Sequence, residues 1–384
     1  MKKKICVVIT ARPSYSRIRT ALKAIQQHPD LELQLVVAAS ALLDRYGATV
    51  NYIEQDGFKI SEKVYMIIEG ATLTTSAKTT GIGIMELSTA FDNLKPDMVC
   101  TIGDRYETMA TAIAASYMNI PLVHIQGGEV TGNIDEKVRH AISKLADLHL
   151  VSNKDARERL IKMGEYPEKI FITGCPSIDI ARHVKENPAL DFDPCEKYGG
   201  VGPYISPDQP FIVVMQHPVT TEFEHAREQT ESLIKVVEKT GLPVFWFWPN
   251  PDAGSDGTSN AIRSFREDNP GNNFRFFKNM EGHDFLKLLL KSKCLIGNSS
   301  VGIRECSYLG VPVVNIGSRQ NRRLRGKNVI DTGYSTASLS EALSKQIEHG
   351  HYPSEHLYGD GHSAAEIAAV IASQQPQITK VISY

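Results

Sequence analysis

Residues 297–305 combine side chains that can hold an anion. They follow the apolar run 294–296 and read GNSSVGIRE. We expect a helix to begin at Ser299 and Ser300, so that backbone N–H groups and two hydroxyls lie at the positive end of its dipole. Glu305 then lies about one and a half turns into the helix, available to a sugar hydroxyl. A nucleoside diphosphate fits this pattern, although Asn and Ser are also ordinary N-cap residues.

Acidic side chains that could transfer protons follow two apolar runs in the first half of the chain. Asp104 comes after the run 98–102 and a glycine, and Glu129 follows the run 122–125 together with Gln126. A carboxylate placed beside a substrate can act as a general acid or base. For Asp104, capping the following helix is an equally good interpretation, because Asp is a preferred N-cap residue.

Asp135 and Arg139 lie one helical turn apart in the segment that comes next, which predicts that they share one face of a helix. Such a pair can belong to a site. A modest surface salt bridge is the more common explanation, because oppositely charged residues at this spacing are frequent on helices.

The second half offers a histidine and an amide at corresponding places. His217 follows the run 211–215, and Asn250 follows the run 244–248. Histidine can exchange a proton near neutral pH, although a lone histidine at a strand end is more often structural. The amide of Asn250 suits hydrogen bonds to a sugar or a phosphate.

Two arginines are candidates for phosphate contacts. Arg12 follows the first apolar run, 5–9, where its guanidinium could bind a phosphate. Arg319 begins a stretch with five cations in nine residues, ending at Lys327. A solvated charged surface is the usual explanation for such a stretch, and only a position facing a binding crevice favours anion binding.

The elements that must position these residues are visible as a regular alternation of short apolar runs and helical patterns. The runs show no period of two, which predicts parallel strands covered by helices on both faces. We expect two doubly wound α/β halves joined by the proline-rich segment 187–210, with ligands in the crevice between them at the carboxyl ends of the strands. The runs are 5–9, 33–38, 98–102, 122–125, 148–151 and 170–172, then 211–215, 244–248, 274–277, 295–296, 313–316 and 329–330.

The composition is that of a globular protein long enough for two domains, with 384 residues and 42% hydrophobic side chains. Lys and Arg number 42 against 44 Asp and Glu, so the net charge of −2 gives no footprint for nucleic acid or an anionic membrane. No run approaches the roughly 20 apolar residues of a membrane span, and no signal-peptide cleavage site is evident. Six cysteines without Cys-x-x-Cys spacing predict free thiols in a cytoplasmic protein.

Motifs of several other enzyme classes are missing. Residues 81–86 begin like a dinucleotide loop but lack the third glycine and a preceding strand, so we expect a helix there. There is no P-loop, no Gly-x-Ser-x-Gly elbow and no zinc-protease spacing of histidines. Hydride transfer and metal-dependent hydrolysis are therefore disfavoured.

Taken together, these motifs resemble the hydrolysing UDP-N-acetylglucosamine 2-epimerases of sialic and legionaminic acid biosynthesis, and more distantly their non-hydrolysing relatives. The resemblance runs along nearly the whole chain and depends on segments 103–105, 124–129, 134–140, 216–221, 297–300 and 317–320. It implies a two-domain fold like that of GT-B glycosyltransferases, without metal or nicotinamide cofactor. Residues 1–186 would form the Rossmann-like domain with the carboxylates, 187–361 the nucleotide-binding domain, and 362–384 a helical end that packs back on the first domain. A homodimer or homotetramer is expected by analogy.

The resemblance also implies the chemistry. Anti elimination of UDP across C1 and C2 would give 2-acetamidoglucal, and addition of water would then release N-acetylmannosamine. Asp104 and Asp135 are the implied carboxylates, while His217 transfers a proton or lies near the diphosphate, and Glu305 binds the ribose hydroxyls. The full set of expected substrate contacts is Arg12, Arg105, Arg139, Asn250, Ser299, Ser300, Glu305 and Arg319.

Gln126 departs from the family pattern, because many relatives carry glutamate at this place. An amide cannot act as a base, although it can orient a water or the N-acetyl group by hydrogen bonds. Either Asp104, Asp135 or Glu129 covers the step, or the sugar differs, or the chain binds nucleotide sugars without turnover. A GT-B-fold glycosyltransferase is the other alternative. The 2-acetamido sugar and the base of the nucleotide, uracil or guanine, stay open.

Overall fold

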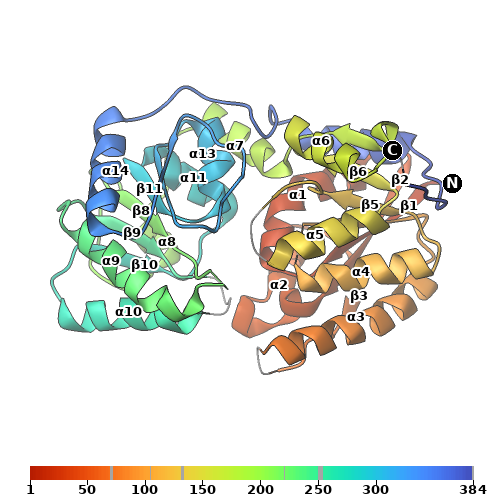
Figure 1. The fold of residues 1–384 in the computed structure, drawn as a ribbon, viewed down its shortest axis with the longest axis horizontal. Helices are drawn as coiled ribbons and strands as arrows, with labels where there is room; N and C mark the ends of the chain where they lie inside the picture. Colours follow the sequence, from red (N-terminus) through yellow and green to blue (C-terminus); the bar gives the residue numbers. More distant parts are fainter. Residues whose placement is uncertain (70–71, 104, 131–133, 220, 250–253, 383–384) are drawn as a thin grey trace. The chain divides into compact units, whose positions relative to one another are not determined.

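The computed structural model describes residues 1–69, 72–103, 105–130, 134–219, 221–249 and 254–382, except for the side chains of residues 45, 73, 134 and 135. Within this part, the chain forms two compact units (Figure 1). The first unit contains residues 1–130, 134–179 and 358–382, and the second contains residues 180–357. The chain passes from the first unit to the second within helix α7 (Pro176–Glu186), shortly before the proline-rich segment.

The first unit is built on a seven-stranded parallel sheet with the order β3-β2-β1-β4-β5-β6-β7. Its strands are β1 (Lys3–Ile9), β2 (Leu31–Ala38), β3 (Ile60–Val64), β4 (Met98–Ile102), β5 (Leu122–Ile125), β6 (Leu148–Val151) and β7 (Ile170–Ile172). Its other helices are α1 (Arg12–Gln27), α2 (Thr49–Gln55), α3 (Leu73–Leu94), α4 (Tyr106–Tyr117), α5 (Ile134–Leu145), α6 (Lys154–Lys162) and α15 (Ser363–Ser373), with short 3-10 turns at Ala39–Leu42, Asp44–Tyr46 and Pro167–Lys169.

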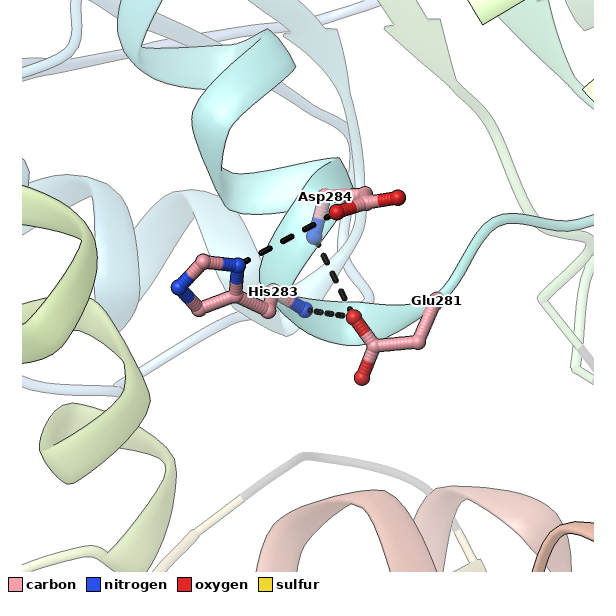
Figure 2. Close-up of side chains that lie close together, drawn as sticks. All are labelled: Glu281, His283 and Asp284. Atoms are coloured by element: carbon pink, nitrogen blue, oxygen red, sulfur yellow. Dashed lines mark hydrogen bonds and ion pairs between the residues drawn. The ribbon is translucent and has the colours of Figure 1, made fainter. Parts of the chain in front are cut away.

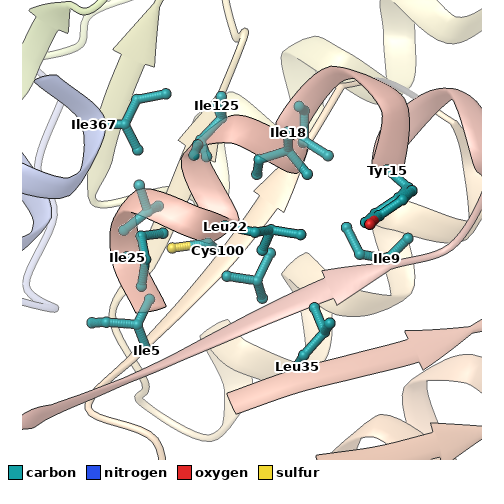
Figure 3. Close-up of a cluster of buried hydrophobic side chains, with 14 of the residues drawn as sticks. Ile5, Ile9, Tyr15, Ile18, Leu22, Ile25, Leu35, Cys100, Ile125 and Ile367 are labelled. Atoms are coloured by element: carbon teal, nitrogen blue, oxygen red, sulfur yellow. The ribbon is translucent and has the colours of Figure 1, made fainter. Parts of the chain in front are cut away.

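Strand β1 shows why the first sheet is covered on both faces. Ile5 and Ile9 belong to a core cluster with side chains of α1 and α15 (Figure 3). Cys6 and Val8, which point to the opposite face, belong to a cluster with α3, α4 and α5. Because successive side chains of a strand alternate between faces, a run that is apolar at every position is buried on both. The parallel, doubly covered sheet predicted from the apolar runs is confirmed.

The C-terminal helix returns to the first unit, as the resemblance implied. Ile367 of α15 is fully buried in the same cluster as α1 (Figure 3). Lys3 of β1 donates to the carbonyls of Ile371, Ala372 and Gln374 at 3.0, 3.0 and 2.7 Å. These are carbonyls that the end of a helix leaves without intrahelical partners, and a lysine ammonium satisfies them.

Lys380 caps a second helix in the same way. Its ammonium donates to the carbonyls of Ser143, Lys144 and Ala146 at the end of α5, at 3.2, 2.9 and 2.6 Å. It also pairs with the buried carboxylate of Glu165 at 2.6 Å. The segment after α15 therefore holds the C-terminal end of α5 in place.

The second unit has a six-stranded parallel sheet with the order β10-β9-β8-β11-β12-β13. One face is covered by an aromatic cluster that includes Trp246 and Phe274 and packs against α9, α10 and α14. The strands are β8 (Ile212–Met215), β9 (Val244–Phe247), β10 (Phe274–Phe277), β11 (Cys294–Gly297), β12 (Val313–Ile316) and β13 (Val329–Thr332). The helices are α8 (Pro194–Tyr198), α9 (Ala226–Glu238), α10 (Ser255–Asp268), α11 (Gly282–Lys291), α12 (Ser300–Ile303), α13 (Glu305–Leu309) and α14 (Thr336–His349), with a 3-10 turn at Phe223–His225.

Other expectations from the sequence can be compared with these elements. Residues 81–86 lie inside α3, so the helix predicted there is confirmed. All six cysteines lie in the described part of the chain, where they are buried and form no disulfide. Among the helices of the described residues, none is both long and apolar enough to cross a membrane.

Candidate functional site

Three neighbouring strands of the second unit end in polar residues that contact one another. His217 follows β8, Asn298 follows β11, and Arg319 and Gln320 follow β12. The Oδ1 of Asn298 accepts the backbone N–H of His217 at 2.8 Å, and its Nδ2 donates to the His217 carbonyl at 2.8 Å. Arg319 and Gln320 both donate to the Asn298 carbonyl, at 3.3 and 2.9 Å. We call these four residues the strand-end cluster.

His217 is a neutral imidazole in this cluster. Its residue is 6% exposed. Burial holds its pKa well below the ordinary value of 6.5, and the positive charge of Arg319 lowers the pKa further. Without a ligand, His217 can therefore accept a hydrogen bond at neutral pH, but it is a weak base and not a ready proton donor. A bound diphosphate would favour its protonation, because an adjacent negative charge stabilises the imidazolium.

The helix expected after residue 297 differs from the prediction. Ser299 is the N-cap of α12, which has only four residues, and its hydroxyl accepts the N–H of Val301 at 3.5 Å. The chain bends at Arg304 (φ −99°, ψ −71°), and Glu305 begins a separate short helix, α13. The single helix with Glu305 well inside it is therefore wrong. After the bend, residues 306–309 of α13 are all buried.

This difference changes how Ser299 and Ser300 could bind an anion. A helix of four residues aligns few peptide dipoles, so the contribution of its macrodipole is small. Their binding capacity rests instead on local N–H and hydroxyl donors, which lie directly after Asn298 of the strand-end cluster. Both roles considered from the sequence, cap and anion contact, remain compatible with Ser299.

In the first unit, the loop after β5 is fixed by buried hydrogen bonds. Glu129 is 4% exposed, and its carboxylate accepts the hydroxyl of Ser152 at 2.7 Å. Arg139 of α5 is 2% exposed and donates to the Glu129 carbonyl at 3.0 Å. Arg139 is therefore not a surface residue, while its pairing with Asp135 lies outside the described side chains. Its guanidinium joins α5 to the loop that carries Glu129.

Gln126 is also turned into the protein. It is 1% exposed, its backbone is in the left-handed region at φ 64°, and its Nε2 donates to the thiol of Cys175 at 2.9 Å. The amide group thus has a structural partner in the ligand-free chain. A glutamate here would place a carboxylate against the same buried thiol.

Of the remaining predicted residues, two are described by the structure and three lie wholly or partly outside the described part. Arg12 begins α1, with its guanidinium carbon 5.4 Å from the ring centre of Tyr52. Arg105 pairs with the buried carboxylate of Glu107 at 3.1 Å. Asp104 and Asn250 lie outside the described residues, as does the side chain of Asp135, whose backbone is the second residue of α5.

His124 is a buried residue whose connections the sequence did not reveal. Its Nε2 lies 2.9 Å from the carbonyl of Gly103, the residue before Asp104, and its Nδ1 lies 3.0 Å from the hydroxyl of Ser143 in α5. Gly127 leaves room for this contact, because an added Cβ would lie 2.8 Å from the His124 ring and 2.9 Å from the Ser143 hydroxyl. His124 thus connects the end of β4 to α5. Its only signal in the sequence is a histidine inside an apolar strand, which is typical of an ordinary core residue.

We expect His124 to make the first unit sensitive to acid. Burial lowers its pKa from 6.5 to about 3. Below pH 6.5 the unfolded chain therefore takes up a proton that the folded chain does not. The stability is fully present above pH 6.5 and is lost as the pH falls toward 3, by about 1.4 kcal/mol per pH unit, or about 2 kcal/mol at pH 5.

The variant His124→Gln tests this dependence, because glutamine keeps a donor and an acceptor but does not titrate in this range. Between pH 7 and pH 5 it is expected to lose about 2 kcal/mol less stability than the wild type. Hydrogen exchange in peptides of β5 and α5 is the suitable measurement, because both tryptophans lie in the second unit and their fluorescence reports that unit. Equal losses in the two proteins would contradict the prediction.

A possible cation cluster lies elsewhere in the second unit. Figure 2 shows Glu281, His283 and Asp284 at the start of α11, with candidate ligand atoms within 4.8 Å of one another. These groups already have other partners. Glu281 caps the helix by accepting the N–H groups of His283 and Asp284 at 2.7 and 3.3 Å, and Asp284 pairs with Lys197 at 2.6 Å. A cation here would compete with that ammonium, so we assign the cluster a helix-capping role.

A hollow of about 360 Å³ lies beside the edge strand β10. It is lined by side chains that include Arg263, Arg266, Glu267 and Phe276. Of the predicted site residues that the structure describes, none lines this hollow, so we do not assign it to the reaction.

Comparison with known proteins identifies the family. A sequence model of the UDP-N-acetylglucosamine 2-epimerases matches residues 23–372. The UDP-N,N'-diacetylbacillosamine 2-epimerase (hydrolyzing) of Legionella pneumophila is 35% identical over 95% of this chain and 94% of its own length. The UDP-N-acetylglucosamine 2-epimerase of Neisseria meningitidis serogroup B is 31% identical over 94% of this chain and 92% of its own length.

Comparison with solved structures finds the same fold in enzymes of this name. A crystal structure of UDP-GlcNAc 2-epimerase from Neisseria meningitidis bound to UDP-GlcNAc superposes with a TM-score of 0.81, covering 97% of this chain and all of that one. At 19% sequence identity this likeness shows the fold, which is the predicted pair of Rossmann-like domains of GT-B type. The sequence matches show that the chain belongs to the UDP-N-acetylglucosamine 2-epimerase family.

Proposed function

We propose that the chain is a hydrolysing 2-epimerase, which converts a UDP-linked 2-acetamido sugar and water into UDP and the free sugar epimerised at C2. The observation that carries the proposal is the 35% identity, over 95% of the chain, to a Legionella protein whose name specifies the hydrolysing reaction. The strand-end cluster supports it, since a cationic group and a neutral imidazole lie together at the ends of three parallel strands.

The first step is the elimination of UDP. A base removes the proton from C2, the C1–O bond breaks, and its electron pair leaves with UDP while the C1=C2 bond of 2-acetamidoglucal forms. We assign the base to Asp104 or Asp135, with Glu129 as the third carboxylate of the same unit. Negative charge grows on the diphosphate, so preorganised donors stabilise the transition state more than the ground state. Arg319 and His217 are the described groups suited to this task.

The second step is the addition of water. The hydroxyl bonds to C1, and a proton is delivered to C2 on the face opposite to the one that lost it, so the sum of both steps is hydrolysis with inversion at C2. Two ionisable groups are needed, because the base of the first step faces the wrong side of the sugar for the second. The Ser152 hydroxyl holds the carboxylate of Glu129, and Arg139 holds its backbone carbonyl, so this carboxylate has a fixed position in the protein.

The sugar is proposed as a class. The named relatives include one that acts on a diacetylbacillosamine and one that acts on N-acetylglucosamine, and both are UDP-linked. What the two sugars share is the 2-acetamido group beside the anomeric carbon. We therefore propose that the chain acts on sugars with this 2-acetamido group, whatever substituents they carry at C4 and C6.

The test is incubation with UDP-N-acetylglucosamine, UDP-N,N'-diacetylbacillosamine and their GDP counterparts in heavy water. We expect release of free UDP from at least one of them, together with a reducing sugar that carries one deuterium at C2. Transfer of the sugar to an acceptor with hydrogen retained at C2 would indicate a glycosyltransferase instead. A stable complex that releases no nucleotide would indicate a binding protein, and Gln126→Glu would then be the variant to examine for turnover.

A further inference from the structure

We propose that Asn298 is the positioning residue of the strand-end cluster, with one buried amide fixing the three loops that bind the leaving diphosphate. The inference rests on the proposed function and deepens it, because it names the group that arranges the diphosphate contacts. Asn298 is completely buried, so it acts through its neighbours and not by contact with substrate.

The side chain of Asn298 continues the sheet where its backbone pairing stops. Strands β8 and β11 are paired up to Met215 and Gly297, and the N–H of Asn298 still donates to the Met215 carbonyl at 3.1 Å. Gly297 has φ +145°, and a Cβ there would lie 2.1 Å from that carbonyl, so the chain turns at a place where only glycine fits. Beyond the turn, the amide of Asn298 supplies the donor and the acceptor for His217, both at 2.8 Å.

The carbonyl of Asn298 holds the third loop. Arg319 and Gln320, which follow β12, both donate to it. The next residue in the chain, Ser299, is the N-cap of α12. A displacement of Asn298 would therefore move the backbone of His217, the guanidinium of Arg319 and the first donors of α12 at the same time.

This position requires a primary amide of this length. An aspartate would direct a carboxylate oxygen at the carbonyl of His217, so two acceptors would face each other. An alanine would leave the N–H and the carbonyl of His217 without these partners inside the protein, and such buried groups are strongly disfavoured. The sequence allowed Asn298 to be an N-cap, but the structure gives that place to Ser299 and connects the asparagine to His217, 81 residues away.

The test compares Asn298→Ala and Asn298→Asp with a matched control, Asn328→Ala. Asn328 is 1% exposed, lies in the same unit, and donates to the carbonyl of Val311 at 2.8 Å, but it contacts no member of the strand-end cluster in the described structure. The measurements are the UDP dissociation constant by calorimetry, kcat and KM for the UDP-sugar, and the thermal midpoint.

We expect both Asn298 variants to bind UDP roughly tenfold more weakly or worse and to lose about 10²-fold in kcat/KM, because misplaced catalytic contacts cost rate steeply. Asn328→Ala is expected to lower the thermal midpoint while keeping the UDP dissociation constant within about twofold, since distant sites act independently. Lower midpoints with unchanged UDP affinity in the Asn298 variants would overturn the inference. If the wild type binds UDP but hydrolyses no sugar, the proposed function fails while the affinity comparison still decides the role of Asn298. Absence of UDP binding by the wild type would overturn both.

Discussion

Replacing Asp135 by asparagine is expected to lower kcat about 10²–10⁴-fold, the range associated with loss of a general acid or base. The UDP dissociation constant should change little, because the carboxylate is proposed to act on the sugar. Deuterium incorporation at C2 during turnover is the direct measurement. The same substitution at Asp104 completes the experiment, because the two steps of the reaction need two groups.

The helix that carries Asp135, α5, is held at several points, so it cannot easily shift to place another group where the carboxylate was. Arg139 ties the helix to the Glu129 loop, Ser143 ties it to His124, and Lys380 caps its last turn. A matched control is Asp155→Asn, since Asp155 is a partly exposed acid in the first turn of α6, 3.9 Å from Arg159. That change removes a comparable interaction with a helix terminus, worth about 0.3–1 kcal/mol. Normal turnover in Asp135→Asn, or an equal loss in the control, would contradict the assignment.

Replacing Arg319 by methionine is expected to lower kcat/KM about 10²–10³-fold, as for other donors that stabilise developing charge, and to weaken UDP binding. Methionine keeps most of the length of the side chain but removes the charge and the hydrogen bond to the Asn298 carbonyl. The pKa of His217 should rise at the same time, because Arg319 is one of the two causes that lower it, although burial, the larger cause, keeps it below the ordinary value. NMR titration of the His217 ring measures this shift.

The control for this prediction is Arg322→Met in the same cationic stretch. Arg322 is exposed, whereas Arg319 is partly buried and directed at the strand-end cluster. If the five cations were simply a solvated surface, both substitutions would weaken UDP binding slightly and to a similar degree. A large effect at Arg319 with a small one at Arg322 assigns the anion contact to one residue.

The strands that contain a continuous apolar run were predictable, and β1 with its run 5–9 is the clearest example. The strand β3 was missed, because its sequence ISEKV is polar and partly exposed at the edge of the sheet. An edge strand has a neighbour on one side only, so it needs no continuous apolar run, and local periodicity cannot reveal it. The bend at Arg304 was missed for a related reason, since it accompanies the burial of residues 306–309, which is a tertiary feature that local periodicity does not show.

The sequence predicted which loops carry the candidate site, but it did not predict which residues contact one another there. Residues that follow parallel strands were good candidates because those strand ends lie along one edge of a sheet, and His217, Asn298 and Arg319 do meet in this way. The partners themselves are set by tertiary structure. His124 reaches the Gly103 carbonyl 21 residues away, and the guanidinium of Arg139 is buried against a backbone carbonyl, although its spacing from Asp135 suggested a surface ion pair.

The way in which Lys3 and Lys380 close the first unit has a consequence for biosynthesis. The unit that begins with strand β1 is completed only by α15 and the segment after it, which are translated after all its other parts. Residues 180–357 are contiguous and can acquire their structure while the ribosome is still at work. We therefore expect the first part of the nascent chain to stay incompletely folded until residues 358–382 emerge from the exit tunnel.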